Sequence, residues 1–235
     1  FNKGFDYFDE KGAFDGKYAI IESVNERIAE KLKEVKGRKF FLFIHYMDVH
    51  CPYTPPKPYL SMYDSSNSSL NLTGKCGWTY FNFVNLTQED VKRIIAAYDG
   101  EIRYTDEHIG KLIKKMEELN LLNKTIIILT ADHGEELKDH GFIGHGHSLY
   151  NELIHVPLII YHPRMGNRIV DTQVQLIDIM PTVLDLLDIE VPNQIQGRSL
   201  LPLIYSNTKV DSPAFSELYS LISVRYQNFH FIYNI

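Results

Sequence analysis

Ile126-Ile127-Ile128-Leu129-Thr130-Ala131-Asp132-His133-Gly134-Glu135 is the stretch that decides the fold of this chain. Four apolar residues in a row, three of them β-branched, predict a strand over 125–131 that is covered on both faces. Ligands in open α/β sheets bind just beyond the carboxyl ends of strands, so Asp132 and His133 are predicted to hold one divalent cation. The alternative is a simple Asp-His-Gly turn, in which Asp132 caps a helix that begins near Glu135.

A second turn, Asp139–His147, follows at once and carries three histidines separated by glycines. Glycines at 141, 144 and 146 would let the backbone approach a ligand closely. We expect His145 to contact substrate, with His147 and then His140 as further candidates. A tight loop whose histidines face water, or a zinc site built from several histidines, would give the same pattern. Carboxylate and imidazole groups gathered in one loop system indicate chemistry on an anionic ester.

A third group of polar residues follows a predicted strand over Phe40–Tyr46. We expect His50, just past this strand, to be functional, because a protonated imidazole can bind an anion or donate a proton to a leaving alkoxide. His45 is expected to pack in the sheet, and Asp48 to hold the loop by accepting hydrogen bonds from backbone amides.

The hydrophobic pattern elsewhere predicts alternating helices and strands, which is typical of an α/β layer fold in one domain. Residues 61–86, rich in Ser and Asn, are expected to form a surface excursion. The expected helices are 17–36, 87 to about 119 with a weak point at Gly100, and 178–187, and the further strands are 156–161 and 223–226.

Composition limits the classes of partner. The formal net charge of −6 argues against a general nucleic-acid binder, which needs clustered Lys and Arg for phosphates. No apolar run approaches the roughly 18 residues that a transmembrane helix requires, so no membrane segment is expected. Cys51 and Cys76 could form a disulfide or remain thiols. The chain starts at Phe1 without a methionine, which we interpret as an internal cut.

These stretches together resemble the sulfatases, within the alkaline-phosphatase-like superfamily. The resemblance covers nearly the whole chain and implies an α/β fold with a central, largely parallel or mixed sheet flanked by helices. The matching segments are Phe40–Tyr53, Thr130–Glu136, Gly144–Ile160 with Tyr150 and Val156-Pro157-Leu158, Gly4-Phe5-Asp6 and Gly197–Pro202.

The resemblance also implies roles for individual residues. Asp132 and His133 match two metal ligands, the second of which is asparagine in some members. His50 takes the place of a substrate-binding histidine, and His145 falls where many members carry a lysine that contacts sulfate. We therefore expect His50 and His145 to be catalytic and to bind substrate, and His147 to bind substrate as well.

The implied metal is calcium, although a nitrogen ligand in place of an amide oxygen keeps magnesium and manganese open. The implied substrate is a small-molecule or carbohydrate sulfate ester. Nothing in the sequence indicates an oligomeric state.

One departure from the family pattern concerns the nucleophile. Sulfatases use a formylglycine made from Cys or Ser in a Cys/Ser-x-Pro/Ala-x-Arg motif, and neither Cys51, Cys76 nor any serine lies in one. The family's N-terminal metal aspartates are absent too. We therefore expect residues 1–235 to be a partial catalytic domain that lacks its N-terminal part, stops inside the C-terminal region and is inactive alone. The alternatives are a phosphate or phosphonate ester hydrolase or phosphoryl transferase of the same superfamily, and a non-catalytic module.

Overall fold

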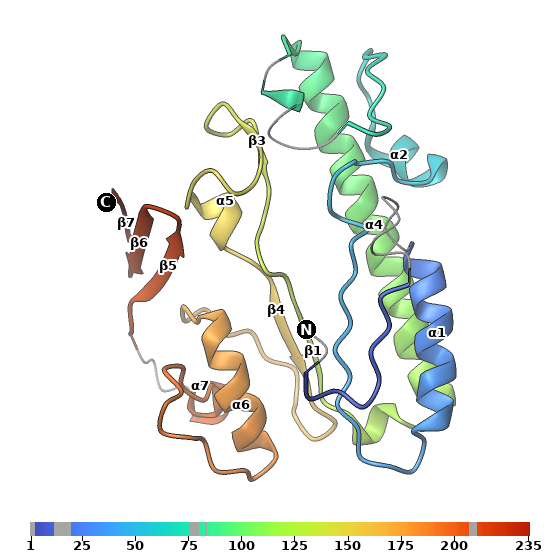
Figure 1. Cartoon of the computed structure of the whole chain (residues 1–235), viewed down its shortest axis with the longest axis vertical. Helices are drawn as coiled ribbons and strands as arrows, with labels where there is room; N and C mark the ends of the chain where they lie inside the picture. Colours follow the sequence, from blue (N-terminus) through green and yellow to red (C-terminus); the bar gives the residue numbers. More distant parts are fainter. Residues whose placement is uncertain (1–2, 12–19, 76–79, 83, 207–210) are drawn as a thin grey trace. The chain divides into compact units, whose positions relative to one another are not determined.

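The computed structural model describes residues 3–11, 20–75, 80–82, 84–206 and 211–235 (Figure 1). The chain folds into two compact units. The first unit comprises residues 1–126 and 136–144, and the second comprises residues 127–135 and 145–235.

The first unit is built on one long helix, α4, which spans Gln88–Glu118. Thr87 caps this helix: its side chain accepts a hydrogen bond from the Asp90 amide, and the Asp90 carboxylate accepts one from the Thr87 amide. Helix α1 (Ile21–Glu34) packs against α4, as does α2 (Lys57–Tyr63), and the one-turn η1 (Leu122–Lys124) follows it (Figure 1). The predicted helix 17–36 is thus confirmed from Ile21, while 17–19 lie outside the described residues.

The predicted weak point at Gly100 is wrong, because α4 runs through it without interruption. Gly100 is buried, and a Cβ atom there would lie 2.8 Å from Cγ of Pro55 and 3.3 Å from the Leu60 amide nitrogen. The glycine therefore lets the chain around α2 approach α4 closely and does not break the helix.

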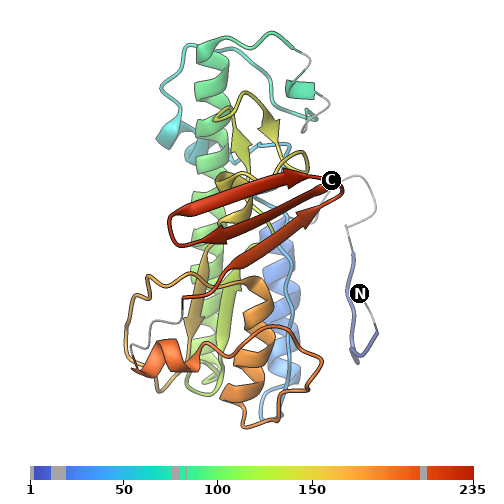
Figure 2. The ribbon, with the colours of Figure 1, turned by 90° about the vertical axis from the view of Figure 1, so that its left-hand side faces the viewer.

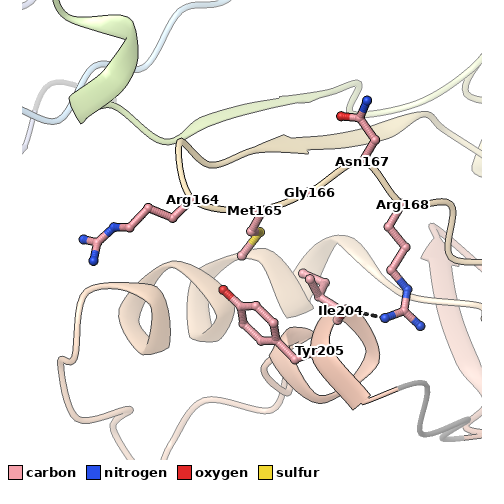
Figure 3. Close-up of a pocket in the computed structure, with 7 residues that line it drawn as sticks. All are labelled: Arg164, Met165, Gly166, Asn167, Arg168, Ile204 and Tyr205. Atoms are coloured by element: carbon pink, nitrogen blue, oxygen red, sulfur yellow. Dashed lines mark hydrogen bonds between the residues drawn. The ribbon is translucent and has the colours of Figure 1, made fainter.

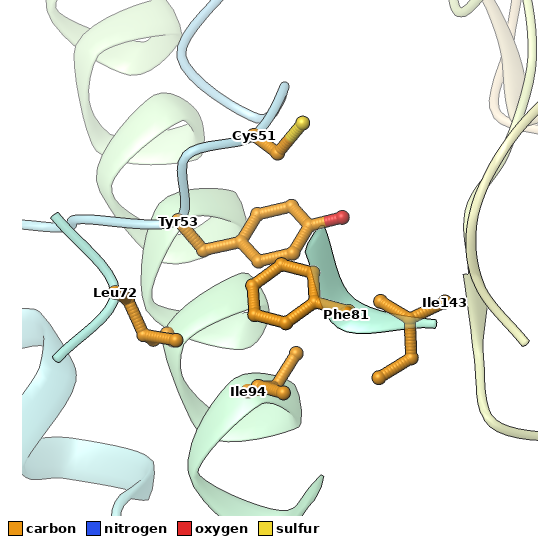
Figure 4. Close-up of a cluster of buried hydrophobic side chains, with 7 residues drawn as sticks. Cys51, Tyr53, Leu72, Phe81, Ile94 and Ile143 are labelled. Atoms are coloured by element: carbon orange, nitrogen blue, oxygen red, sulfur yellow. The ribbon is translucent and has the colours of Figure 1, made fainter. Parts of the chain in front are cut away.

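The core of the first unit draws on a segment that the sequence places at the surface. Leu72 and Phe81, both within 61–86, are buried there, so that prediction is corrected (Figure 4). The rings of Tyr53 and Phe81 are stacked with centroids 6.5 Å apart. Cys51 is disulfide-bonded, and Cys76 lies outside the described residues. The other buried members are Ile94, Ala97 and Ile143.

Ile143 belongs to a short antiparallel hairpin of β2 (Glu136–Leu137) and β3 (Ile143–Gly144). Asn82 holds this hairpin to the core, donating to the Ile143 carbonyl at 3.0 Å and accepting from its amide at 3.1 Å.

Residues 40–46 do not form the predicted strand. Phe41 and Phe43 are 73% and 60% exposed, and the exposed His45 stacks on Phe43 instead of packing in a sheet. Aromatic and β-branched side chains favour an extended backbone but do not supply the neighbouring strand whose backbone hydrogen bonds complete a sheet. The expectation for Asp48 is confirmed, because its Oδ1 accepts from the Ile21 amide at 3.0 Å.

The second unit contains β1 (Ile127–Thr130), which pairs antiparallel with β4 (Leu158–Tyr161). Residues 127–129 of β1 are half-buried and Thr130 is exposed, so this strand is not covered on both faces as predicted. Every pairing among the described residues is antiparallel, where the sequence predicts a largely parallel or mixed sheet. Three of the four residues of β1, Ile127, Ile128 and Leu129, belong to the apolar run in the sequence, whereas the direction of strand pairing depends on the path by which the chain returns.

The rest of the second unit consists of short helices and a three-stranded sheet. Figure 2 shows this sheet as three long adjacent arrows, in the order β5 (Ala214–Leu218), β6 (Leu221–Tyr226) and β7 (Phe229–Asn234). The predicted strand 223–226 forms the last four of the six residues of β6. The helices are α5 (Asn151–Ile154), η2 (Leu176–Asp178), α6 (Ile179–Leu186) and α7 (Leu201–Ser206). No helix in the described part of the chain is long and apolar enough to cross a membrane.

Candidate functional site

The turn after β1 carries the predicted metal ligands, and α5 holds it in place. The Gly134 amide donates to the Leu153 carbonyl at 2.8 Å. A Cβ atom on Gly134 would lie only 2.0 Å from the Glu152 carbonyl oxygen, so no other residue fits without a shift of the backbone. Residues 131–135 form no helix, which removes the alternative of Asp132 as a helix cap.

Asp132 and His133 present their side chains at the surface of this turn. The Asp132 side chain is 71% exposed and that of His133 is 39% exposed. His133 Nδ1 lies 2.9 Å from the Gly134 carbonyl, which can only accept, so Nδ1 carries a proton and Nε2 is the ring nitrogen left for a metal. Metal-binding histidines commonly make this kind of second hydrogen bond.

The two ligand atoms fit a single cation. His133 Nε2 lies 3.9 Å from Asp132 Oδ2. Bonds of about 2.0–2.6 Å from each atom would reach one Mg²⁺, Mn²⁺ or Ca²⁺ ion placed between them. A carboxylate oxygen and an imidazole nitrogen at this separation are two atoms that a divalent cation could bind together.

His145 lies against the same turn. Its ring packs on that of His133, with centroids 4.1 Å apart and an interplanar angle of 31°. Its Nδ1 lies 3.0 Å from Oε1 of Glu135, whose side chain is only 4% exposed. The hydrogen bond to Glu135 raises the pKa of His145 above its ordinary value, against the opposing effect of burial. An imidazole whose pKa is raised and that lies beside the two predicted metal ligands could bind an oxyanion when it is protonated.

No role for Glu135 was predicted from the sequence. The partner of His145 lies ten residues earlier, and no periodicity links the two. The signal in the sequence was the acidic residue Glu135, two positions after His133, the second of the predicted metal ligands.

The other histidines of the second turn have different surroundings. His147 is half-buried in the second unit, and His140 is exposed in the first unit. The amides of His140 and Phe142 donate to Glu136 Oε1 at 3.0 and 2.9 Å, so this buried carboxylate shapes the turn. Gly141 and Gly146 have φ of +97° and +80° with open space at their Cβ positions. These two glycines are needed for backbone conformation, and not for close packing.

His50 belongs to the first unit. That it lies close to Asp132 stays a prediction. His50 is half-buried, and its Nδ1 lies 2.7 Å from the Cys51 carbonyl. That carbonyl makes Nδ1 the protonated nitrogen and Nε2 the one directed to other groups, as in His133.

A separate pocket of about 230 Å³ lies in the second unit (Figure 3). It contains none of the predicted site residues. Arg168 Nη1 donates to the Ile204 carbonyl at 2.6 Å, and the Arg164 side chain extends away from Met165 and Tyr205 (Figure 3). The positions of Arg164 and Arg168 therefore do not indicate a binding site in this pocket.

The fold is that of an α/β protein of the alkaline-phosphatase-like class. The chain belongs to the sulfatase family, because the family model described as Sulfatase matches residues 1–189. An arylsulfatase of Clostridium perfringens is 32% identical over 200 residues, which cover 77% of this chain and 40% of that protein. This chain therefore spans well under half the length of that relative.

Solved structures agree on the fold. A phosphonate monoester hydrolase of Agrobacterium radiobacter superposes with a TM-score of 0.72 at 21% identity, covering 93% of this chain and 54% of the other. A second structure, solved in complex with its substrate D-glucosamine-2-N,6-O-disulfate, has a TM-score of 0.53 at 27% identity, over 63% of this chain and 33% of the other. The predicted fold class and family are confirmed, and the family implies a divalent metal.

Proposed function

We propose that this chain supplies part of the active site of a sulfate-ester hydrolase. Asp132 and His133 hold the cation, while His145 and His50 bind the sulfate group. The observation that carries the proposal is the packing of the His145 imidazole on His133, 4.1 Å away, in a turn that also bears Asp132. Metal ligands and an anion-binding cation are thereby brought together within one unit.

A bound divalent cation would act as a Lewis acid on a sulfate oxygen and stabilise negative charge as the ester bond breaks. Calcium is the cation that we propose. Magnesium and manganese are the alternatives, because His133 offers nitrogen.

The histidines would work on the substrate itself. His145, with its raised pKa, binds a sulfate oxygen in the charged form. His50 binds a second oxygen or donates a proton to the leaving oxygen, and His147 makes a further contact with the substrate. Formylglycine would supply the nucleophile. Cys51 is not its source, because its sulfur is in a disulfide.

The proposed substrate is a small-molecule or carbohydrate sulfate ester. The family supports the sulfate, and the neighbour solved with a disulfated glucosamine supports a carbohydrate as one such substrate.

The test is hydrolysis of 4-nitrophenyl sulfate by the full-length protein before and after chelation, and after calcium is restored. Wild-type protein should lose activity with a chelator and regain it with the metal, whereas Asp132→Ala should be inactive in all three states. Asp171→Ala, at another exposed aspartate of the same unit, is the matched control and should behave as wild type. Full turnover by Asp132→Ala would refute the assignment.

The same assay separates the rival functions. Turnover of a phosphonate monoester with no turnover of sulfate esters would place the protein with the phosphoryl-transfer members of the superfamily. Metal binding with no turnover of either ester would indicate a non-catalytic module.

A further inference from the structure

We propose that Glu135 is a positioning residue that fixes the ring orientation and the tautomer of His145. The binding of an anion by His145 rests on the function proposed above. The positioning of the His145 ring by Glu135 rests on the geometry of the second unit alone.

The first step concerns the burial of Glu135. Its side chain is 4% exposed, whereas that of Asp132 in the same turn is 71% exposed. A carboxylate that is removed from water needs a partner that offsets its desolvation. His145 Nδ1, 3.0 Å from Glu135 Oε1, is that partner.

The second step concerns the tautomer. An ionised carboxylate only accepts hydrogen bonds, so the proton of the shared bond belongs to Nδ1 of His145. Nε2, on the opposite edge of the ring, is then the nitrogen directed away from Glu135. The bond therefore decides which nitrogen of His145 faces a ligand.

The third step concerns rigidity. Gly134, the neighbour of Glu135, is fixed to α5 by its hydrogen bond to the Leu153 carbonyl. The His133 ring restrains His145 from one side. One short turn thus orients the His145 ring and carries the two proposed metal ligands, so the anion site and the metal site are positioned together.

The next residue in the sequence, Glu136, makes hydrogen bonds of a different kind. Glu136 is fully buried, but its Oε1 accepts from the backbone amides of His140 and Phe142. Glu135, in contrast, bonds to the ring of a side chain that we place in the substrate site. The difference predicts that changes at Glu135 act through His145.

The first test uses the ¹⁵N NMR shifts of the His145 ring nitrogens in the full chain, assigned with His145→Ala. At a pH high enough for the imidazole to be neutral, Nδ1 of wild type should show the shift of a protonated nitrogen and Nε2 that of an unprotonated one. Glu135→Ala should give a mixture of tautomers, and Glu135→Gln, which keeps the acceptor oxygen, should restore the wild-type pattern. Glu190→Ala, at an exposed glutamate of the same unit, is the control and should change nothing. Proton on Nε2 alone in wild type, or an unchanged spectrum in Glu135→Ala, would overturn the proposal.

The second test is a double-mutant cycle with 4-nitrophenyl sulfate in the full-length protein. Glu135→Ala should lower kcat/KM by about 10- to 100-fold, in the range seen when groups that orient a ligand are removed. Glu135→Gln should recover most of this loss. The double variant with His145→Ala should be no worse than His145→Ala alone, because Glu135 acts through that ring. Losses that multiply would overturn the proposal.

Thermal unfolding of each variant accompanies both tests. If Glu135→Ala does not fold, Glu135→Asp replaces it, because the shorter side chain withdraws the acceptor but keeps the charge. Absence of sulfate-ester turnover in wild type would count against the proposed function only, since the NMR result decides the positioning without any substrate.

Discussion

The backbone carbonyl of Glu152 lies directly against the Cα atom of Gly134. A Cβ atom at position 134 would sit 2.0 Å from the Glu152 oxygen and 3.0 Å from its carbonyl carbon. The turn that presents Asp132 and His133 is therefore held by α5 through backbone contacts.

Gly134→Ala should disrupt this contact. The backbone has to move to admit the methyl group, and we expect a loss of about 1–3 kcal/mol in the free energy of unfolding, measured with urea. Affinity for a divalent cation, measured by calorimetry, should fall with it. Gly110→Ala is the matched control, because Gly110 lies in α4 with open space around it and should gain up to about 1 kcal/mol. A Gly134→Ala variant with wild-type stability would mean that the turn is not held in this way.

Much of this turn could be predicted from the sequence, for a physical reason. A run of β-branched residues followed by Asp132, His133 and a glycine predicts both the strand and the polar residues at its end. The histidines of the next turn were identified by type. The bond from His145 to Glu135 could not be predicted, because it depends on the path of the chain between them.

The predictions that failed concern partners in space. Residues 40–46 have strand-forming side chains but no hydrogen-bonding neighbour among the described residues. Gly100 was predicted to weaken the helix. The close approach of Pro55 explains instead why position 100 carries a glycine. Local sequence sets backbone preference, whereas pairing and close packing depend on segments that are distant in the chain.

Substitutions at His133 should separate the requirement for a ligand from the choice of metal. His133→Ala removes a ligand and should weaken binding of Mn²⁺ and Ca²⁺ by at least about tenfold. His133→Asn provides an oxygen ligand and should favour Ca²⁺ over Mn²⁺, because Ca²⁺ prefers oxygen. Calorimetric titration of the full-length protein measures both. Equal affinities in wild type and His133→Ala would exclude this imidazole from the metal site.

Glu101 should make the stability of the first unit depend on pH. This carboxyl group is 6% exposed and accepts from the Thr54 amide at 2.8 Å. Burial raises its pKa to about 8, with a further contribution from the charge of Asp48. Because the folded pKa lies above the unfolded one, the folded state binds more protons between the two values. The contribution of the neutral group is thus fully present below a pH of about 4.5 and is lost as the pH rises through about 8.

The measurement for Glu101 is urea denaturation over this range of pH. The free energy of unfolding should fall with rising pH in wild type. Glu101→Gln keeps the acceptor for Thr54 but cannot ionise, so its profile should be flatter and its stability above pH 8 higher than that of wild type. Parallel profiles for the two proteins would show that another group is responsible.

Thr182 links α6 to the segment around Leu200 through two hydrogen bonds of its hydroxyl group. The side chain is fully buried; its Oγ1 donates to the Asp178 carbonyl at 2.6 Å and accepts from the Leu200 amide at 2.9 Å. Thr182→Val keeps the shape but leaves the buried amide without its acceptor, which should cost about 1–3 kcal/mol.

Urea denaturation of Thr182→Val, followed by a probe of the second unit such as amide exchange at Leu200, measures this cost. Thr73→Val, at an exposed position, is the control and should stay within about 0.5 kcal/mol of wild type. It has to be measured in unglycosylated protein, because Thr73 completes an Asn-x-Thr sequence.

The Leu200 segment has a second attachment, because the side chain of Asp178 accepts a hydrogen bond from the Arg198 amide at 2.9 Å. Exchange at Leu200 should therefore accelerate more than exchange at Arg198, and equal acceleration at both would show that the segment is released as a whole.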